Sequence, residues 1–313
     1  MSSPSPKKIV PTIAITLGDP AGIGPEITAK TLRDPRLPKG FCFEVLGKKS
    51  GRGIHPGKLS RTSARSALNA LEEAAQGCRS GRFAAMVTGP VHKLAVSRLQ
   101  PDFIGQTEFL ARACGLPDEA AVMVLTDPKL TVALCSSHCP LKEAVDRLTP
   151  ERIVNVAKIT RLFLQQRGIA QPRLAFAAVN PHMGENGLFG DEDLRIVLPA
   201  CKKLREEKII LCHLPADTIF YYAVQKKAFD AVICAYHDQG LIPFKQVAFE
   251  TGVNITLGLP IIRTSPDHGT ALEIAGQGIA DHRSMLAAVQ LACRLVRAKT
   301  ERHEPQENAG NTG

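Results

Sequence analysis

The sequence predicts an α/β protein whose sheet is largely parallel. Segments rich in β-branched and apolar residues alternate with segments whose apolar residues recur every three or four positions. Strands that alternate with helices in this way form a sheet covered by helices. Polar turns rich in Gly and Pro follow several of the predicted strands. Ligands bind outside the carboxyl ends of such strands, so these turns are where we expect a site.

The predicted elements follow from these periodicities. We expect strands at Ile9–Leu17, Phe41–Leu46, Phe83–Val87, Ala121–Leu125, Leu130–Cys135, Arg173–Val179, Lys208–Cys212 and Ala231–Cys234. We expect helices at Pro25–Leu32, Thr62–Cys78, Thr149–Gln166, Asp193–Glu206 and Asp281–Ala298. The third helix carries the best signals, with Thr149 as N-cap, Pro150 at its first position and Gly168 just past its end.

Composition excludes several classes of protein. The chain has 313 residues, of which 44% are hydrophobic and 22% charged, as in soluble globular proteins. No apolar run of about 18 residues could span a membrane, so we expect no membrane partner. Met1–Lys8 lacks the apolar stretch of a secretory signal, which predicts a cytoplasmic protein. The net charge of +9 is scattered and no Trp is available for stacking on bases, so we expect no nucleic-acid partner.

The nine cysteines include no C-x-x-C pair, and most lie in apolar or helical segments. They are interpreted as reduced cysteines of a protein core. Cys139 is the exception, because it follows His138 in a polar, loop-like stretch.

Three histidines, His138, His182 and His237, each come just past a predicted strand. Neutral imidazole is the commonest metal ligand, and three protein ligands with one open position make a catalytic metal site. A single histidine in such a place is usually a loop residue, but three in equivalent positions favour a metal site. The same three residues would also suit the zinc site of a hydrolase.

Other polar residues point to acid–base chemistry and to anion binding. Asp217 and Asp238 could orient a histidine ligand or act as a base, although Asp217 would equally suit a helix start. Lys245, Asn254 and Arg263 form a polar set in an apolar neighbourhood. Two cations with an amide suit a phosphate, and ordinary surface charge is the alternative.

The Gly-rich turn at 18–26 follows the first predicted strand and opens a helix. It lacks the third glycine of the dinucleotide fingerprint G-x-G-x-x-G and the Lys of a phosphate-binding loop. Its residues alone therefore indicate only a tight turn that lets backbone approach a ligand.

Six longer motifs together resemble the 4-hydroxythreonine-4-phosphate dehydrogenase family of pyridoxal phosphate biosynthesis. They are TLGDPAGIGPEI at 16–27, GQTEFL at 105–110, NPHMG at 180–184, PADT at 215–218, YHDQGLIPFK at 236–245 and VNITLGLPIIRTSPDHGTA at 253–271. The resemblance extends from Ile9 to about Met285. Several of the motifs are long, so chance agreement is an unsatisfactory explanation.

The resemblance implies an activity and a site. That family oxidises the C3 hydroxyl of 4-phosphohydroxy-L-threonine with NAD or NADP, and the β-keto acid product loses CO₂ to give 3-amino-2-oxopropyl phosphate. It implies a divalent metal (Zn, Co or Mg) on the three histidines and an active site at a homodimer interface. It implies substrate contacts from position 106 and from Thr107, Lys245, Asn254 and Arg263, and catalytic positions for Asp217, Asp238 and Lys245.

A more distant likeness concerns the cofactor. GDPAGIGPE at 18–26 and DHGTALEIAGQGIAD at 267–281 are similar to segments of isocitrate and isopropylmalate dehydrogenases. The likeness implies that the adenosine end of the nucleotide is held by a loop containing His268, Gly269, Thr270, Ala271 and Glu273. It also explains the missing dinucleotide fingerprint, since that fold binds the nucleotide differently.

The sequence departs from the family pattern at two places. Gln106 stands where the pattern G-H-T-E has a histidine, and an amide can donate and accept hydrogen bonds but cannot carry a proton charge. The stretch from Gly47 to Ser60 is short, so a loop or strand of the family is missing. Both departures leave room for a related substrate, such as a phosphorylated sugar acid like 4-phosphothreonate.

We therefore expect a two-domain subunit of the isocitrate/isopropylmalate dehydrogenase type with its active site in the interdomain cleft. Residues 9–103 with 255–298 would bind the cofactor, residues 104–254 would bind metal and substrate and form the dimer, and 1–8 and 299–313 would be flexible tails. The alternatives are a same-fold dehydrogenase of a phosphorylated sugar acid, a zinc hydrolase or lyase without nucleotide, and a basic nucleic-acid-binding protein.

Overall fold

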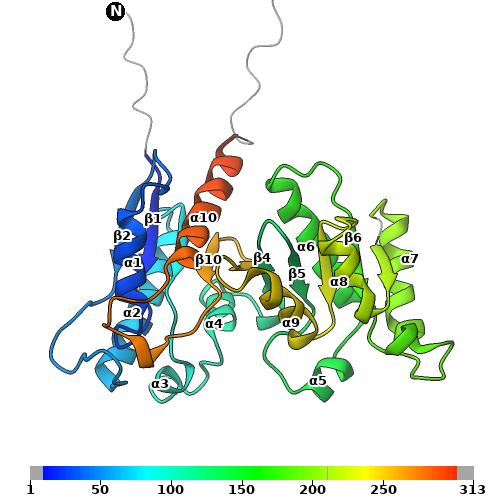
Figure 1. Cartoon of the computed structure of the whole chain (residues 1–313), viewed down its shortest axis with the longest axis horizontal. Coiled ribbons are helices and arrows are strands. Elements are labelled where there is room, and N and C mark those ends of the chain that lie inside the picture. The colour runs from blue at the N-terminus through cyan, green and yellow to red at the C-terminus, as the bar shows by residue number, and fades with distance from the viewer. Residues whose placement is uncertain (1–9, 210, 302–313) are drawn as a thin grey trace, which may run out of the picture.

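The fold is built on a single ten-stranded sheet (Figure 1). The structure is a computed structural model that describes residues 10–209 and 211–301. The strands lie in the order β2-β1-β3-β10-β9-β4-β5-β8-β6-β7. Their bounds are β1 Thr12–Thr16, β2 Cys42–Leu46, β3 Ala85–Thr88, β4 Val122–Thr126, β5 Thr131–Leu134, β6 Leu174–Ala177, β7 Leu211–Leu214, β8 Ala231–Cys234, β9 Val253–Leu257 and β10 Arg263–Pro266.

The direction of the strands changes in the middle of the sheet. The pairs among β2, β1, β3 and β10 are parallel, and so are the pairs among β5, β8, β6 and β7. Between these groups, β9 and β4 join β10 to β5 by antiparallel pairs. The two parallel groups therefore run in opposite directions, and the prediction of a largely parallel sheet is confirmed outside the centre.

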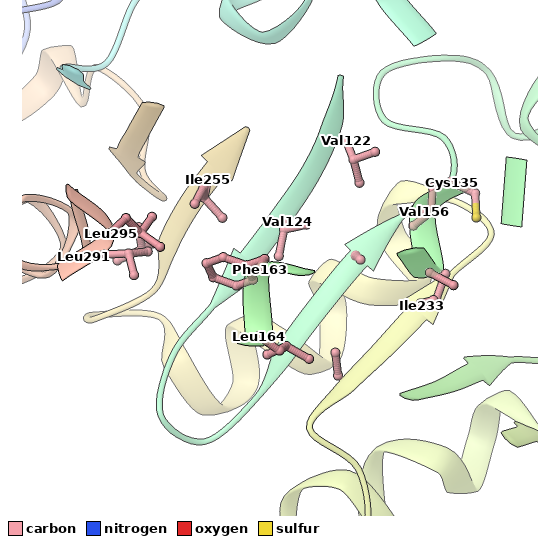
Figure 2. Close-up of a cluster of buried hydrophobic side chains, with 14 of the residues drawn as sticks. Val122, Val124, Cys135, Val156, Phe163, Leu164, Ile233, Ile255, Leu291 and Leu295 are labelled. Carbon is pink, nitrogen blue, oxygen red and sulfur yellow. The ribbon is translucent and has the colours of Figure 1, made fainter. Parts of the chain in front are cut away.

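One face of the sheet is covered from end to end. The helices α1 (Gly24–Arg33), α10 (Arg283–Glu301), α6 (Pro150–Gln166) and α7 (Leu198–Glu206) all contribute to one hydrophobic cluster with the inward side chains of the strands. Figure 2 shows its centre, where Phe163 of α6 and Leu291 of α10 lie near Val124 of β4 and Ile255 of β9. Burial of this surface is the main stabilising contribution to the fold.

The opposite face is covered by two separate groups of helices. The first group is α2 (Arg61–Arg79), α3 (Lys93–Ser97) and α4 (Gln106–Ala113), and the second is α8 (Ala216–Val224) and α9 (His237–Ala248). Each group packs on its own hydrophobic cluster. Between them, the central strands present polar side chains, Asn254 and Thr256 from β9 and Arg263 and Ser265 from β10, which pair across the two strands. An open, polar floor is therefore left at the centre of the sheet.

Shorter elements complete the fold. Helix α5 (Leu141–Asp146) follows His138, and single 3₁₀ turns cover Asp118–Ala120, Pro181–Gly184 and Leu272–Ile274. A π turn at Asp193–Val197 precedes α7, whose second residue is Pro199. The loop between β2 and α2 contains two isolated bridges, Gly51 with Ile54 and His55 with Lys58.

The predicted elements are found, mostly with shorter strands. The cap of α6 is confirmed, since the Thr149 side chain accepts a hydrogen bond from the Arg152 N–H at 3.1 Å. The pairing of the strands on either side of Asp127-Pro128 is confirmed as well. The strand predicted at Lys208–Cys212 is displaced to β7, because Lys208 has a left-handed backbone (φ 60) that turns the chain before the strand begins.

The predicted domain boundary and tails differ in part from the structure. Strand β9 pairs with β4 over five residues, so the sheet is continuous where we expected a boundary between domains, and the two-domain division stays a prediction. Helix α10 runs to Glu301, so residues 299–301 are helical rather than part of a tail, and the Thr300 hydroxyl donates a hydrogen bond to the Val296 carbonyl oxygen at 3.1 Å. The remaining tail residues, 1–8 and 302–313, lie outside the described residues. In the part that the structure describes, no helix is long and apolar enough to cross a membrane.

Candidate active site

The gap between the two helical groups forms a cleft of about 360 Å³ above the polar floor. The first group contributes Lys93, Gln106 and Thr107, and the turn after β3 contributes Gly89 and Pro90. The second group contributes His237, Leu241 and Lys245. The cleft is also lined by Thr88, Val91, Phe103, Met123, His138, Asn254, Arg263, Ser265, Pro266, Asp267, His268 and Gly269. Three predicted sets, the metal ligands, the phosphate ligands and the cofactor loop, thus each contribute residues to one cavity.

Arg263 is the best-anchored side chain of this cleft. Only 3% of the residue is exposed, and burial lowers the pKa of its guanidinium to about 10. The guanidinium donates two hydrogen bonds to Thr88 Oγ1 at 3.0 and 2.8 Å and one to Thr256 Oγ1 at 2.9 Å. It also reaches Asn254 Oδ1 and Gln106 Oε1, each at 3.3 Å. Its planar donors therefore tie β3, β9 and α4 together beneath the cleft.

Gln106 and Lys245 lie on opposite walls. Gln106 donates from Nε2 to the Gly89 carbonyl at 3.1 Å, so its amide bridges Arg263 and the turn after β3. Lys245 Nζ donates to the carboxylate and the carbonyl oxygen of Asp267, both at 3.1 Å. Burial raises the pKa of Asp267 in spite of this neighbouring ammonium. Lys245 therefore reaches the cleft from α9, and its ammonium contacts a carboxylate whose ionised form is disfavoured by burial.

Two of the three predicted metal ligands lie side by side. The rings of His138 and His237 have centroids 5.6 Å apart, because β5 and β8 are neighbouring parallel strands and each histidine follows its strand. His237 Nδ1 lies 2.6 Å from Asp238 Oδ1, and His138 Nδ1 lies 3.5 Å from Glu108 Oε1. In each ring one nitrogen faces a carboxylate, which leaves Nε2 for a ligand.

His182 is not brought to the other two histidines within the chain. It follows β6, the strand next to β8, but it is exposed and its ring lies against Phe189 at a centroid distance of 6.2 Å. Among the described residues, no three His, Cys, Asp or Glu side chains form a group that could hold a metal ion. One chain therefore offers two of the three expected ligands at one point.

The loop around His182 has an unusual backbone. His182, Met183, Glu185 and Asn186 all have left-handed φ values, between 42° and 60°. Such conformations cost free energy in residues other than Gly and persist where the surroundings impose them. Here Asp193 accepts hydrogen bonds from the backbone N–H groups of residues 179 and 180 at 2.9 Å each, and from His213 at 2.8 Å. A buried carboxylate thus fixes the start of the loop.

The two predicted carboxylates are both exposed. Asp238 is in the first turn of α9, and its Oδ1 lies 2.6 Å from His237 Nδ1. Asp217 is in the first turn of α8 and is not among the described residues that line the cleft. The structure of one chain therefore does not bring Asp217 to the other predicted catalytic residues.

The predicted cofactor loop divides between the cleft and its rim. His268 and Gly269 line the cleft, and burial lowers the pKa of His268. Thr270 accepts a hydrogen bond from Ile23 N–H at 2.9 Å, and a Cβ on Gly22 would lie 2.6 Å from the same carbonyl oxygen. The Gly-rich turn is therefore needed for close packing against this loop. Ala271 has a left-handed backbone, and Glu273 is exposed in the following 3₁₀ turn.

Sequence reasoning missed three polar residues of this region, Thr88, Lys93 and Glu108. Within residues 10–209 and 211–301, the Lys93 ammonium has no hydrogen bond or ion pair, and desolvation lowers its pKa. Burial would raise the pKa of Glu108, but its contacts with His138 and Ser137 leave that pKa lowered. Glu108 lies within the GQTE motif, whose spacing on a helix is the signal that could have identified it.

Comparison with known proteins is consistent across sequence and structure. A family model described as pyridoxal phosphate biosynthetic protein PdxA matches residues 27–292. A 4-hydroxythreonine-4-phosphate dehydrogenase from Geobacter metallireducens is 40% identical over 330 aligned residues, covering 92% of this chain and 96% of that protein. That alignment is longer than this 313-residue chain, so the relative has segments that this chain lacks.

Solved structures extend the comparison. The structure of a 4-hydroxythreonine-4-phosphate dehydrogenase from Klebsiella pneumoniae matches with a TM-score of 0.76 at 34% identity, covering 91% of this chain and 99% of that one. A β-decarboxylating dehydrogenase from Thermococcus kodakarensis, at 17% identity and a TM-score of 0.55, shares the fold over 93% of this chain and 84% of that one. The distant likeness to decarboxylating dehydrogenases is therefore confirmed at the level of fold. From the extent of the family match and the identity to its members, this chain belongs to the PdxA family.

Proposed function

We propose that this chain is a metal-assisted, NAD(P)-dependent 4-hydroxythreonine-4-phosphate dehydrogenase. It would oxidise the C3 hydroxyl of 4-phosphohydroxy-L-threonine, and the resulting β-keto acid would lose CO₂ to give 3-amino-2-oxopropyl phosphate. The single observation that carries the proposal is the composition of the cleft, which is lined by the paired imidazoles of His138 and His237 together with a set of cations and amides. Relatives that share 40% identity bear the same name.

The residues present fit a divalent metal. His138 and His237 lie close together, each has one nitrogen turned to a carboxylate, and imidazole nitrogens suit zinc or cobalt. These two residues would hold the ion together with His182. The bound ion would lower the pKa of the substrate hydroxyl and withdraw charge from the ketone that follows.

The third ligand and Asp217 are proposed to come from a second copy of the chain. His182 and Asp217 lie beside exposed apolar side chains on the same half of the sheet, with Leu188 73% exposed, Phe189 48%, Tyr221 52% and Tyr222 44%. Large exposed apolar side chains of this kind are typical of protein interfaces. A homodimer through this surface would bury them and would give His182 and Asp217 a site to complete.

The cations and amides of the cleft suit the phosphate. Lys245, Asn254 and Arg263 supply two cations and an amide, and Thr107 and Gln106 supply further hydrogen-bonding groups from α4. Lys93 adds a further cation from α3. These residues would orient C3 toward the histidines, so that positioning contributes to the rate.

The nucleotide would enter over the loop that follows β10. His268 and Gly269 line the cleft, and Thr270, Ala271 and Glu273 continue the loop across the Gly-rich turn at residues 18–24. When bound, the nicotinamide would accept a hydride from C3, which no side chain can do. Asp217 or Asp238 would take the hydroxyl proton. The Lys245 ammonium would bind the substrate's phosphate by charge attraction.

The test is reduction of NAD or NADP, followed at 340 nm with 4-phosphohydroxy-L-threonine, with and without a chelator. The proposal predicts reduction that a chelator abolishes and that added Zn²⁺ or Co²⁺ restores. Turnover of the substrate without any change in nicotinamide absorbance would instead identify a hydrolase or lyase. Mixing His182→Ala with His138→Ala subunits tests the shared site, because a shared site predicts recovery of part of the lost activity.

A second candidate substrate is 4-phosphothreonate, which carries a hydroxyl where the first substrate has its amino group. The observation that favours it is Gln106 in place of the family's histidine, together with a relative from Bradyrhizobium diazoefficiens, provisionally named a D-threonate 4-phosphate dehydrogenase, at 38% identity. Competition between the two substrates decides between them. If residue 106 distinguishes the two substrates, Gln106→His should change the ratio of their kcat/KM values. An unchanged ratio would show that this residue does not determine the substrate.

A further inference from the structure

Glu108 is a buried acid with no role among the predicted site residues. It lies in the first turn of α4, two residues after Gln106, and only 8% of it is exposed. Unpaired carboxylates are rarely buried, because desolvation disfavours the charged form. Its burial therefore has to be explained by what surrounds it.

Glu108 lines the pocket next to the cleft, and His138 lines both. Glu108 Oε1 accepts a hydrogen bond from Ser137 Oγ at 3.3 Å and lies 3.5 Å from His138 Nδ1, so it contacts two consecutive residues of the loop after β5. The charge of Glu108 acts to raise the pKa of both Lys93 and Arg263, against the lowering effect of their burial. Glu108 is thus an anion that contacts the loop carrying His138 and interacts electrostatically with two cations that line the cleft.

The backbone leaves room for this carboxylate at one particular point. Gly105 is the N-cap of α4 and has no Cβ. A Cβ built at this position would lie 2.7 Å from Glu108 Oε2 and 3.8 Å from His138 Nδ1. The φ of Gly105 is −175°, an extended value that any residue can adopt, so backbone strain does not require glycine here. A Cβ at this position would displace the Glu108 carboxylate from its place. Gly105 and Glu108 therefore act as one unit within the GQTE motif.

We infer that Glu108 positions His138, holding its ring by Nδ1 so that Nε2 faces the metal. The inference rests on the proposed metal site. A carboxylate behind a ligating imidazole fixes the ring orientation and raises its basicity, and losing such a partner typically weakens metal binding about 10–100-fold. Asp238 holds the same relation to His237, but its side chain is 71% exposed and that of Glu108 is 10% exposed, so Glu108 is the more firmly held of the two.

The first measurement is the affinity of the metal-free protein for Co²⁺, by competition with a chelator of known affinity and without nucleotide or substrate. Glu108→Met removes both charge and acceptor and should raise the Kd about 10–100-fold. Glu108→Gln keeps a carbonyl that can accept from Nδ1–H and should raise it less. Glu119→Gln is the matched control, since Glu119 is an exposed acid on the neighbouring pocket wall, and it should leave the Kd unchanged.

Gly105→Ala gives an independent test, because it leaves Glu108 in place and displaces its carboxylate. It should weaken Co²⁺ binding in the same direction. Thermal unfolding of each metal-free variant identifies any that fail to fold. If Glu108→Met fails to fold, the test rests on Glu108→Gln, which keeps the shape of the side chain. Equal Co²⁺ affinity in wild type, Glu108→Gln and Gly105→Ala would overturn the positioning role.

The tautomer of His138 separates this inference from the proposed function. In metal-free protein labelled with ¹⁵N-histidine, the Nδ1–H form of His138 should dominate in the wild type and decrease in Glu108→Met. An unchanged tautomer would overturn the inference whatever metal binds. A wild-type protein that binds no Co²⁺ would overturn the proposed metal site instead.

Discussion

Replacing Arg263 with lysine tests whether the guanidinium is the framework of the cleft floor. Its five hydrogen bonds join residues of β3, β9 and α4, and the residue is 3% exposed. Lysine keeps a positive charge, but a single ammonium cannot reproduce the planar donors of arginine. Burial already lowers the pKa of Arg263 to about 10, and lysine, with a lower ordinary pKa, would lose its charge more readily in the same place.

The expected magnitude follows from the bonds that lysine cannot make. Hydrogen bonds to charged groups contribute about 1.5–3 kcal/mol each, so the loss of about two gives about 3–6 kcal/mol. Total stabilities of domains are about 5–15 kcal/mol, so a loss of this size is readily measured. The effect should appear without any ligand, because the partners of Arg263 are all within the chain.

The assay is urea unfolding of the metal-free protein at pH 7, with Arg294→Lys as control. Arg294 is exposed on α10, and its replacement should change the free energy of unfolding by no more than about 0.5 kcal/mol. A loss below about 1 kcal/mol for Arg263→Lys would refute the reasoning, since the network would then be dispensable. A normal stability with a raised KM would mean that Arg263 acts on the substrate alone.

Three further predictions concern other parts of the molecule. Lys93→Ala should raise KM for the phosphorylated substrate about tenfold, or about 1.4 kcal/mol, with kcat little changed, and steady-state kinetics with an unchanged KM would exclude a contact. Gly18→Ala should destabilise the protein by about 2 kcal/mol or more, because φ is +69° and the new Cβ would lie 2.2 Å from the Pro90 carbonyl oxygen; a melting temperature equal to wild type would contradict this. Burial alone would raise the pKa of Asp193, but hydrogen bonds from His213 and two backbone N–H groups lower it. The ionised carboxylate therefore stabilises the fold above an unfolded pKa of about 3.9, and this stabilisation is lost as the pH falls through the lower folded pKa. The stability difference between wild type and Asp193→Asn, measured by urea unfolding, should therefore narrow below about pH 4, and a constant difference would show that ionisation of Asp193 is irrelevant.

Local chemistry made some elements predictable from the sequence. Helix α6 begins at a Thr with Pro after it, and these residues specify a helix start through their own backbone preferences. His138 and His237 could be grouped because each follows a strand, although the contact between them depends on the pairing of β5 with β8, which no local pattern encodes.

Tertiary packing hid other elements. Helix α9 was not predicted, because it contains Gly240 and Pro243, which disfavour helix in isolation. Strands β9 and β10 were not predicted, because Asn254, Thr256 and Arg263 interrupt the apolar pattern with side chains that satisfy one another across the two strands. The polar residues that obscured these strands are those that form the floor of the cleft.

The candidate site shows the same division. Its members in the cleft were found through motifs, but Glu108 was missed because its partners lie in the loop after β5, some 30 positions further along the chain. Asp217 and His182 were assigned to the site, yet a single chain leaves them outside it. In the proposed homodimer, a second copy of the chain would supply these two residues.

The continuous sheet beneath the cleft has a mechanical consequence. The two walls stand on strands that are hydrogen-bonded to each other from β3 through β10, β9 and β4 to β5, so the walls cannot separate by sliding at a linker. Opening for the nucleotide has to be an elastic change in the twist of these central strands, with the register kept. Ligand exchange would then be governed by the stiffness of five short strands, and amide hydrogens in β9 and β4 would stay protected while the cleft opens and closes.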